Sequence, residues 1–521
     1  MTPLLINGND LSFDDLRQVV YERRPVALAG EAREKVNAAR AVVDKLLREN
    51  RVAYAVNTGV GKLSDVHIEP AQNRQLQLNL IRSHASGVGE PLSQEETRAM
   101  MLLRANSLAK GYSGVRGDVI DCLCELLNRG VHPVVPSQGS VGASGDLAPL
   151  AHLALTMIGE GEAVFESARP EGHDEATPRK GRDENTRMSG AEAMRRAGIK
   201  PLVPEAKEAI SLINGTQAML AVGVLALMSA DTLAQTADVL GAMTLDALHG
   251  TDVAFDARIH DARPHAGQIK VAANLRRLIE GSEIRQSHKD CGRVQDAYSM
   301  RCIPQVHGAV RDTLDFCRRT FEIEMNSAVD NPLVFVKSDG EGDIISGGNF
   351  HGQPLAFALD YMAIALGTLA GISERRIERL VNPTLNEGLP PFLAADAGIN
   401  SGFMMPQVAA AALASENKVL AHPASVDSIT TSGNKEDYVS MGMGAAIKLK
   451  KVVANTTYVL AIEACAAAQA LDFLAPLKTS AALQKAHAAI RKVSPTINQD
   501  RSLAADFVKL AELARAGGIL K

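Results

Sequence analysis

Tryptophan is absent from this chain of 521 residues, and aromatic residues make up only 4% of it. A core with so few aromatic rings has to be built from aliphatic side chains and alanine, which suits closely spaced helices. Cysteine is also scarce, and six thiols are too few for a disulfide framework in a chain of this length. The pair Cys122 and Cys124 does not supply the four ligands of a zinc site, so we expect buried, reduced thiols.

Strong charge and long apolar runs are missing as well. The formal net charge is -5, which is mild and does not indicate binding to nucleic acid or an anionic membrane. The longest apolar runs, such as residues 218–230, end before the ~20 residues of a membrane span. The N-terminal sequence MTPLLINGNDLSFDD lacks the basic start and apolar run of a secretory signal. We therefore expect a cytoplasmic protein without nucleic-acid, membrane or metal partners.

Helical patterns dominate what is present. Apolar residues recur at helical spacing across Glu31–Asn50, and Ser93 with Glu96 forms a capping box before the apolar stretch Thr97–Ala109. Pro204 and Glu205 suit the first turn of a further helix. Segments rich in alanine, leucine and valine indicate buried bundle helices at 217–249, 354–383, 403–421 and 443–472. Strand signals are short and local: Ala53–Val56, Leu333–Lys337 and Ile344–Ser346.

One segment departs from this pattern. Glu166–Arg187 is about half charged, contains glycine and proline and has no periodicity, which is typical of a solvent-exposed loop or insertion. We therefore predict a mainly α protein. A mixed N-terminal domain over residues 1–205 carries the polar insertion, and a long-helix bundle domain follows over residues 206–521.

The most unusual local sequence is Ser137–Leu150, in which small residues crowd around Ser144. One interpretation is a tight turn before a helix. Another is a phosphate-binding loop, although the G-x-x-x-x-G-K-[ST] pattern is missing. In a third, a tight bend brings the amide nitrogen of Gly145 to the carbonyl carbon of Ala143. Cyclisation, loss of water and loss of the Ser144 hydroxyl then give a 4-methylideneimidazol-5-one (MIO), an electrophile made without an external cofactor.

The sequence around Ser144, GSVGASGDLAPLAHLAL, resembles the signature of the aromatic amino acid ammonia-lyase and aminomutase family. Further motifs match that family in the same order along nearly the whole chain: Tyr54–Gly59, Asn214–Gln217, Gln295–Arg301, Asn326–Pro332, Gly348–Gly352 and Ser415–Asn417. The resemblance implies the fold of histidine and phenylalanine ammonia-lyases and MIO as a self-derived cofactor. It also implies a homotetramer whose active sites are shared between subunits.

The resemblance implies roles for individual residues. Ala143, Ser144 and Gly145 would form the electrophile, which makes the amine of the substrate a better leaving group. Tyr54 matches the catalytic tyrosine that removes the β-proton, in a segment that could move as a lid. Arg301 matches the residue that pairs with the substrate carboxylate.

Four further residues are assigned to the same site. Asn214 matches an asparagine near the carbonyl of the electrophile, and Phe350 matches an aromatic residue that lines the pocket. Gln295, Tyr298 and Arg301 stand three residues apart, so one helix face could present all three. We assign Tyr298 to catalysis and Gln295 to substrate binding.

The substrate side chain is expected to lie against His84. Ser83-His84 is common among histidine-specific members of the family, argues against phenylalanine and leaves tyrosine open. The run Ser415–Ser428 and the pair Glu436-Asp437 resemble the histidine-specific pattern, whereas tyrosine and phenylalanine enzymes tend to carry Gln-Asp at the second place. Glu416 could neutralise an imidazolium or accept its N–H.

We therefore predict a lyase that eliminates ammonia from L-histidine to give urocanate. The alternative is a tyrosine ammonia-lyase or a tyrosine 2,3-aminomutase with the same electrophile and base. A helical scaffold that has lost catalysis is a further hypothesis, and it would keep Ala143-Ser144-Gly145 unmodified.

Overall fold

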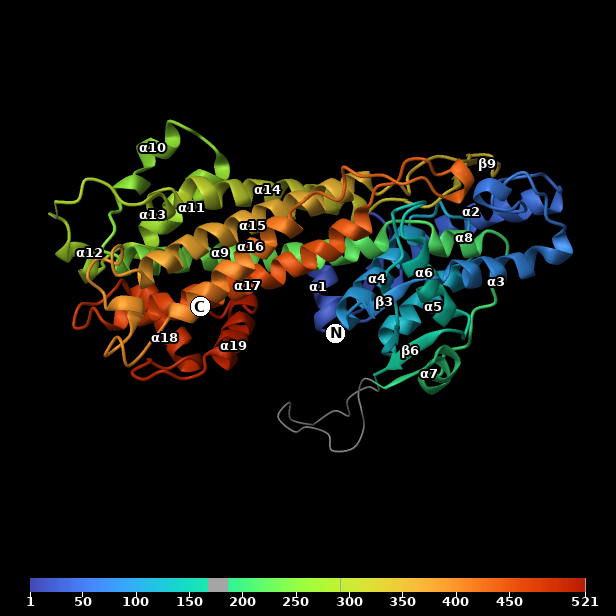
Figure 1. Ribbon diagram of the computed structural model, residues 1–521. Coiled ribbons are helices and arrows are strands. Elements are labelled where there is room, and N and C mark those ends of the chain that lie inside the picture. The colour runs from blue at the N-terminus through green and yellow to red at the C-terminus, as the bar shows by residue number, and fades with distance from the viewer. Residues whose placement is uncertain (167–185, 291, 521) are drawn as a thin grey trace. The chain divides into compact units, whose positions relative to one another are not determined.

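The computed structural model describes residues 1–166, 186–290 and 292–520 (Figure 1). Most of the predicted insertion at 166–187 lies outside these residues. The chain divides into two compact units that each combine three segments. Unit 1 comprises residues 1–225, 319–357 and 424–447, and unit 2 comprises residues 226–318, 358–423 and 448–521. The domain boundary near residue 205 was expected to separate two continuous segments and stays a prediction.

Unit 1 contains short helices and all strands of the described residues. Its helices are α1 (Phe13–Tyr21), α2 (Gly30–Arg48), α3 (Asn73–His84), α4 (Gln94–Ala109), α5 (Gly117–Asn128), α6 (Leu147–Met157), α7 (Gly190–Ala197) and α8 (Glu208–Ile213). Its strands are β1 (Leu4–Ile6), β2 (Val26–Leu28), β3 (Val88–Pro91), β4 (Val131–Pro133), β5 (Pro136–Gln138), β6 (Glu162–Phe165), β7 (Arg187–Ser189), β8 (Leu333–Val336) and β9 (Gly342–Ile345). The parallel pair β1-β2 and the antiparallel groups β3-β5, β4-β6-β7 and β8-β9 make up the sheets. The pair β8-β9 confirms the two strands predicted near residues 333–346.

Local sequence explains where α4 begins and why it is central to unit 1. Ser93 Oγ accepts a hydrogen bond from Glu96 N at 3.2 Å, and the Glu96 carboxylate accepts one from Ser93 N at 2.7 Å. The predicted capping box is therefore present. The helix is buried over nearly its whole length and packs against α1 and α5.

Unit 2 is built from helices. Those that lie wholly within it are α10 (Ala257–Asp261), α11 (Ala266–Ile279), α12 (Glu283–Ser287), α13 (Tyr298–Arg301), α16 (Met404–Leu420), α18 (Ala481–Val493) and α19 (Ala504–Arg515). The long helices α9 (Gln217–Ala247), α14 (Ile303–Met325), α15 (Gln353–Val381) and α17 (Gly442–Asp472) contribute residues to both units. Figure 1 shows the unit 2 portions of these long helices running alongside one another. Ala370 of α15, Ala410 of α16 and Val459 of α17 share one core cluster, and such small side chains let helices approach closely. These helices confirm the predicted bundle.

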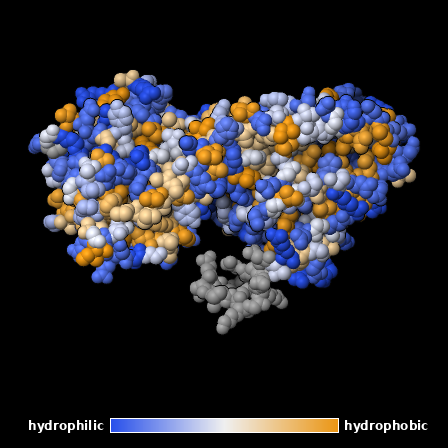
Figure 2. All heavy atoms as spheres, in the orientation of Figure 1, coloured by the Kyte–Doolittle hydropathy of each residue, from blue (hydrophilic) through white to orange (hydrophobic). Residues whose placement is uncertain are grey.

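Among the described residues, two helices, α9 and α15, are long and apolar enough by length and composition to cross a membrane. The uninterrupted apolar runs in the sequence are shorter and did not predict this. The protein itself buries 78% of the most apolar window of α9 and 61% of that of α15. Burial of this extent is expected of core helices. Figure 2 shows hydrophobic and hydrophilic side chains mixed across the face in view.

Two local predictions were wrong. Ala53–Val56 lies in a turn and not in a strand, because Ala55 has φ +58° and the Asn57 side chain accepts a hydrogen bond from Ala53 N at 2.9 Å. Pro204 does not open a helix. The helix that follows begins only at Glu208, after Lys207 in the left-handed conformation with φ +73°. The buried Lys207 ammonium donates to Ser113 O at 2.7 Å, a contact that no local pattern indicates.

Candidate active site

The residues around Ser144 form a strained loop in unit 1, directly before α6. Ser144 has φ +53° and Gly145 has φ +78°, so two successive residues adopt the left-handed conformation. For a residue with a side chain this conformation costs about 1–3 kcal/mol, and it persists only where the surroundings enforce it. The loop is therefore held in a bend that its own sequence does not favour.

The close approach of Gly145 to Gly215 enforces the bend. Asp146 N donates to Gly215 O at 2.7 Å, and Gly145 forms an isolated β-bridge with Gly215. A Cβ on Gly145 would lie 2.2 Å from Gly215 O, so a residue with a side chain does not fit there. A Cβ on Gly142 would lie 2.2 Å from Ser440 Oγ, so a side chain there would require the Ser440 hydroxyl to move. The tripeptide is packed tightly against the segments that carry Gly215 and Ser440.

Two buried polar side chains hold the ends of this bend. Asn214 Nδ2 donates to Ser144 O at 2.9 Å, and the buried Asn214 Oδ1 has no hydrogen-bond partner in the part of the chain that is described. Asp146 is fully buried and accepts hydrogen bonds from Ser140 Oγ at 3.1 Å and Met219 N at 2.8 Å. Burial raises the pKa of the Asp146 carboxyl to about 7.

A carboxylate from the far end of the sequence faces Ser144. Ser144 Oγ donates to Glu436 Oε1 at 2.9 Å, although 292 residues separate the two. The other oxygen, Oε2, accepts hydrogen bonds from Thr431 Oγ1 at 2.9 Å and Ser432 Oγ at 2.6 Å. The sequence singled out Glu436 as part of a histidine-type motif without assigning it to the site. Its Glu-Asp pair, where related tyrosine enzymes tend to have Gln-Asp, was the signal that could have led to it.

His84 is the last residue of α3, and its Nδ1 lies 2.8 Å from Leu80 O. Burial lowers the pKa of His84, while the Leu80 carbonyl and the charge of Glu436 act in the opposite direction. The position of His84 against the substrate side chain stays a prediction.

Tyr54 lies in a segment that packs beside the loop of Glu436. The Tyr54 hydroxyl accepts a hydrogen bond from Gly61 N at 3.2 Å. Gly61 in turn lies against Ser432, because a Cβ on Gly61 would be 3.8 Å from Ser432 Cβ. The candidate base and the candidate carboxylate therefore belong to neighbouring loops.

Phe350 lies just before α15, in a segment that reaches the same region. The ring of the next residue, His351, stacks on Tyr438 with centroids 6.3 Å apart. A Cβ on Gly352 would lie 2.6 Å from the sulfur of Met219, the residue whose backbone N–H binds Asp146. The structure thus brings the Phe350 segment to the electrophile loop.

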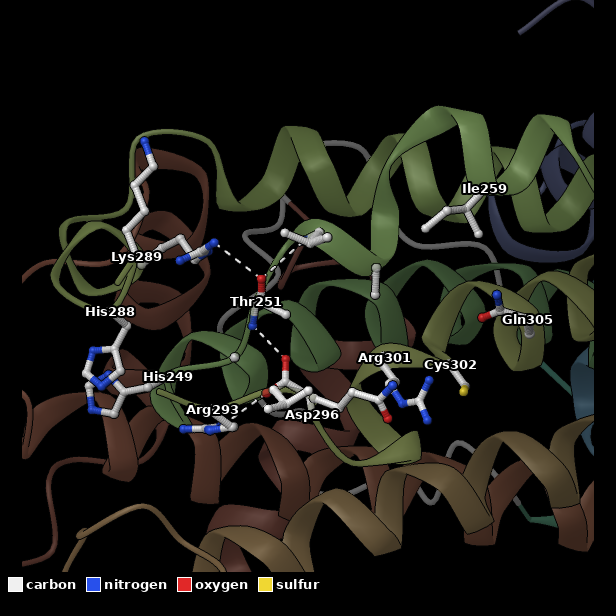
Figure 3. Close-up of a pocket in the computed structure, with 16 residues that line it drawn as sticks. His249, Thr251, Ile259, His288, Lys289, Arg293, Asp296, Arg301, Cys302 and Gln305 are labelled. Carbon is white, nitrogen blue, oxygen red and sulfur yellow. Dashed lines mark hydrogen bonds and ion pairs between the residues drawn. The ribbon is translucent and has the colours of Figure 1, made fainter. Parts of the chain in front are cut away.

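A second group of predicted residues belongs to unit 2, where Gln295 and Arg301 line a cavity of about 460 Å³ (Figure 3). The Arg301 guanidinium lies 4.6 Å from the ring centroid of Tyr298, which is a cation–π contact. Arg301 Nε is buried and has no hydrogen-bond partner among the described residues. Tyr298 is 71% exposed. The guanidinium therefore keeps an unsatisfied N–H donor beside this cavity.

Asp296 anchors the segment that carries these residues. It accepts hydrogen bonds from Thr251 N at 2.6 Å and Arg293 Nη1 at 3.0 Å, and it is buried (Figure 3). The prediction of one helix face for Gln295, Tyr298 and Arg301 was wrong. The backbone is still extended at residue 297, so α13 begins only at Tyr298 and Gln295 lies before it, exposed.

Glu416 lies on α16 in unit 2, where its carboxylate already has partners. It forms an ion pair with Lys451 at 2.5 Å and accepts a hydrogen bond from Asn455 Nδ2 at 2.9 Å. Hydrogen bonding to Lys451 lowers the pKa of Glu416. Its role in substrate binding stays a prediction, and Glu436 is the carboxylate that the structure brings to Ser144. Within residues 1–166, 186–290 and 292–520, no group of three or more His, Cys, Asp and Glu side chains could hold a metal ion.

Comparison with known proteins defines the class. The sequence profile of aromatic amino acid lyases matches residues 11–492, and the chain therefore belongs to the aromatic amino acid lyase family, as the motifs predicted. It is accordingly an enzyme of the lyase class.

Particular relatives are similar over the full length. A histidine ammonia-lyase from Koribacter versatilis is 68% identical over 99% of this chain and 98% of its own length. A crystal structure of histidine ammonia-lyase from Trypanosoma cruzi has a TM-score of 0.89 at 42% identity, over 99% of this chain and 94% of that one. A tyrosine aminomutase from Streptomyces globisporus has a TM-score of 0.91 at 38% identity, over 100% of this chain and 98% of that one. The predicted mainly helical fold of histidine and phenylalanine ammonia-lyases is confirmed.

Proposed function

We propose that this enzyme eliminates ammonia from L-histidine to give urocanate, with an electrophile formed from Ala143-Ser144-Gly145. The observation that carries the proposal is the contact of Ser144 Oγ with Glu436 Oε1 at 2.9 Å. A carboxylate at the reacting tripeptide matches a substrate with a polar, N–H-bearing ring better than an apolar one. The 68% identity to a histidine ammonia-lyase supports the same substrate.

The residues of the tripeptide loop fit a ring of the MIO type. In its formation, a bond joins Gly145 N to the Ala143 carbonyl carbon, and one water leaves with the Ala143 oxygen. A second water takes the Ser144 hydroxyl and the proton on its Cα. The left-handed backbone at Ser144 and Gly145 gives the required bend, and the contact of Gly145 with Gly215 excludes a side chain on the attacking nitrogen's residue. Asn214 supplies an N–H to the Ser144 carbonyl, and such a donor stabilises negative charge that develops on this oxygen.

When present, the ring supplies an electrophilic carbon that makes the amine of the substrate a better leaving group. The other roles fall to ordinary side chains. Tyr54 takes the β-proton, so that the C–H and C–N bonds break and a C=C bond forms. Arg301 binds the substrate carboxylate through its planar guanidinium. His84 and Glu436 bind the imidazole ring, Gln295 and Phe350 bind the substrate, and Tyr298 takes part in catalysis.

We extend the proposal to a homotetramer with shared active sites. Tyr298 is 71% exposed and Gln295 is exposed, yet an elimination site has to exclude water. In unit 2, an apolar cavity of about 710 Å³ between α14 and α15 is lined by Phe316, Tyr361 and Ile364, each of which is more than 40% exposed. Apolar surface of this kind suits a subunit interface. Sedimentation tests the assembly, and full activity in a monomer would contradict it.

The test of the activity is an assay with L-histidine and, separately, with L-tyrosine. We expect urocanate from histidine and no product from tyrosine. The intact mass should be lower than the sequence mass by two waters. In Ser144→Ala this difference should disappear. A full-mass wild-type protein without turnover would support the inactive scaffold instead.

A tyrosine ammonia-lyase or tyrosine 2,3-aminomutase is the second candidate, because a tyrosine aminomutase matches this chain over its full length at a TM-score of 0.91. Its products from L-tyrosine are coumarate or β-tyrosine. Either product would show that the substrate is tyrosine, and it would leave the assignments of the electrophile and the base unchanged.

A further inference from the structure

The loop that carries Glu436 contains its own hydrogen-bond donors. Thr431 and Glu436 form an isolated antiparallel bridge, with Thr431 N donating to Glu436 O at 2.9 Å, so residues 431–436 close on themselves. Between them Ser432, Gly433 and Asn434 have φ of +48°, +59° and +67°. Three successive left-handed residues are costly when two of them carry side chains, which indicates that a specific geometry is being held.

The two oxygens of Glu436 have separate partners. Oε2 accepts both loop hydroxyls, from Thr431 at 2.9 Å and from Ser432 at 2.6 Å. Oε1 is thereby left for the active site, where it accepts the Ser144 hydroxyl at 2.9 Å. In residues 1–166, 186–290 and 292–520, no lysine, arginine or histidine forms an ion pair with this carboxylate. The side-chain contacts of Glu436 are therefore the three hydroxyls of Thr431, Ser432 and Ser144.

The loop hydroxyls hold Glu436 independently of Ser144. This matters for the proposed chemistry, because formation of the electrophile removes the Ser144 hydroxyl and with it the contact to Oε1. Thr431 and Ser432 lie within five residues of Glu436, so their bonds persist after that loss. The same oxygen then faces the substrate with its orientation already fixed, which lowers the entropic cost of catalysis.

We propose that Thr431 and Ser432 are positioning residues that orient Glu436 and aim its free oxygen at residue 144. They act through Glu436 and do not touch the substrate. The inference rests on the proposed function, since turnover is its readout. The wild-type assay tests that function separately, and variant-to-wild-type ratios are measured with whichever substrate the wild type consumes.

The test compares Thr431→Val and Ser432→Ala with two controls. Thr431→Ser keeps the hydroxyl, and Ser428→Ala removes a hydroxyl of the same segment that binds Val439 N at 2.9 Å but does not contact Glu436. Each kcat is expressed per modified site, from the fraction of protein whose intact mass lacks two waters. Loss of a hydrogen bond to a charged group predicts about a tenfold lower kcat for each of the two test variants, with a small change in KM.

The split between kcat and KM and the rescue by a conservative variant separate positioning from a general loss of structure. A loss of positioning lowers kcat per modified site and leaves KM and the temperature of unfolding nearly unchanged. Thr431→Ser and Ser428→Ala should stay within about twofold of the wild-type kcat. The proposal is overturned if Thr431→Val and Ser432→Ala match Ser428→Ala in kcat per modified site, or if Thr431→Ser is as impaired as Thr431→Val.

Discussion

The two groups of candidate site residues differ in how completely each unit holds them. In unit 1 the tripeptide loop is bent by a glycine contact and tied by hydrogen bonds to Asn214 and Glu436. In unit 2 Arg301 lies at an open cavity beside a Tyr298 that is 71% exposed. The contacts of the fold fix the residues that have to make an electrophile. The segment that would bind the substrate carboxylate is instead held through the hydrogen bond of Asp296 with Thr251.

The difference follows from what each group has to do. A peptide bond cyclises only if its atoms are held close together, and a tightly packed bend provides this before any substrate arrives. A substrate-binding group instead has to be accessible, and it completes its contacts when the ligand or another subunit covers it. Substitutions in the two groups should therefore have different kinetic effects.

The largest effect is expected for Ser144→Ala. Without the hydroxyl the methylene cannot form, and kcat should fall by at least about 1,000-fold. Intact mass should show a full-mass chain, and the temperature of unfolding should change little because Ala keeps the backbone of the loop. Retention of most of the activity would mean that the preformed loop of unit 1 is not the source of the chemistry.

The next effect distinguishes the two carboxylates. Glu436→Gln replaces the group that faces residue 144, and kcat should fall by about 100-fold. Glu416→Gln weakens an ion pair with Lys451 at the surface of α16 and should have a much smaller effect. Steady-state kinetics of the two variants checks this order. A greater loss of kcat in Glu416→Gln would support the assignment made from the sequence, in which Glu416 of unit 2 is the carboxylate that binds the substrate.

A smaller and different effect is expected for Arg301→Lys. Lysine keeps the charge but loses the planar pair of donors, so KM should rise by about tenfold while kcat changes less. The fraction of protein that lacks two waters should stay as in the wild type, because Arg301 plays no part in forming the ring. A fall in that fraction would show that Arg301 affects formation of the ring, so the two groups would not have separate functions.

The smallest effect concerns the pH dependence of stability. The pKa of Asp146 rises from an ordinary 3.8 to about 7 on folding, so its stabilising contribution is complete below about pH 4 and is lost as the pH rises to about 7. In the unmodified Ser144→Ala background, the free energy of unfolding with Asp146 should therefore fall between these values relative to Asp146→Asn. Denaturant titrations at several pH values measure the difference, and a constant difference would contradict the buried, titrating carboxyl.

Sequence reasoning was most successful where the signal is local. The long alanine-rich segments became α9, α15, α16 and α17, and the Ser93 capping box is present with both of its hydrogen bonds. Periodicity and capping depend on residues a few positions apart, so one chain suffices to read them.

The errors came from contacts between distant residues. Lys207 delays the start of α8 because it reaches Ser113, and Asp296 turns Gln295 away from the helix because it binds Thr251. Glu436 was noticed as a motif, but only folding brings it to Ser144 across 292 residues. The family resemblance supplied the other site residues, and it named the tripeptide without showing that its backbone is left-handed.

The contact between Gly145 and Gly215 has a consequence for protein engineering. The bend at the tripeptide exists because a carbonyl oxygen from another segment occupies the place of a side chain. Placing Ala-Ser-Gly alone in a foreign scaffold would transfer the reactive residues without the backbone contact that bends them. A portable version of this chemistry would need both segments, Gly142–Asp146 and Asn214–Gly215, held at the same separation.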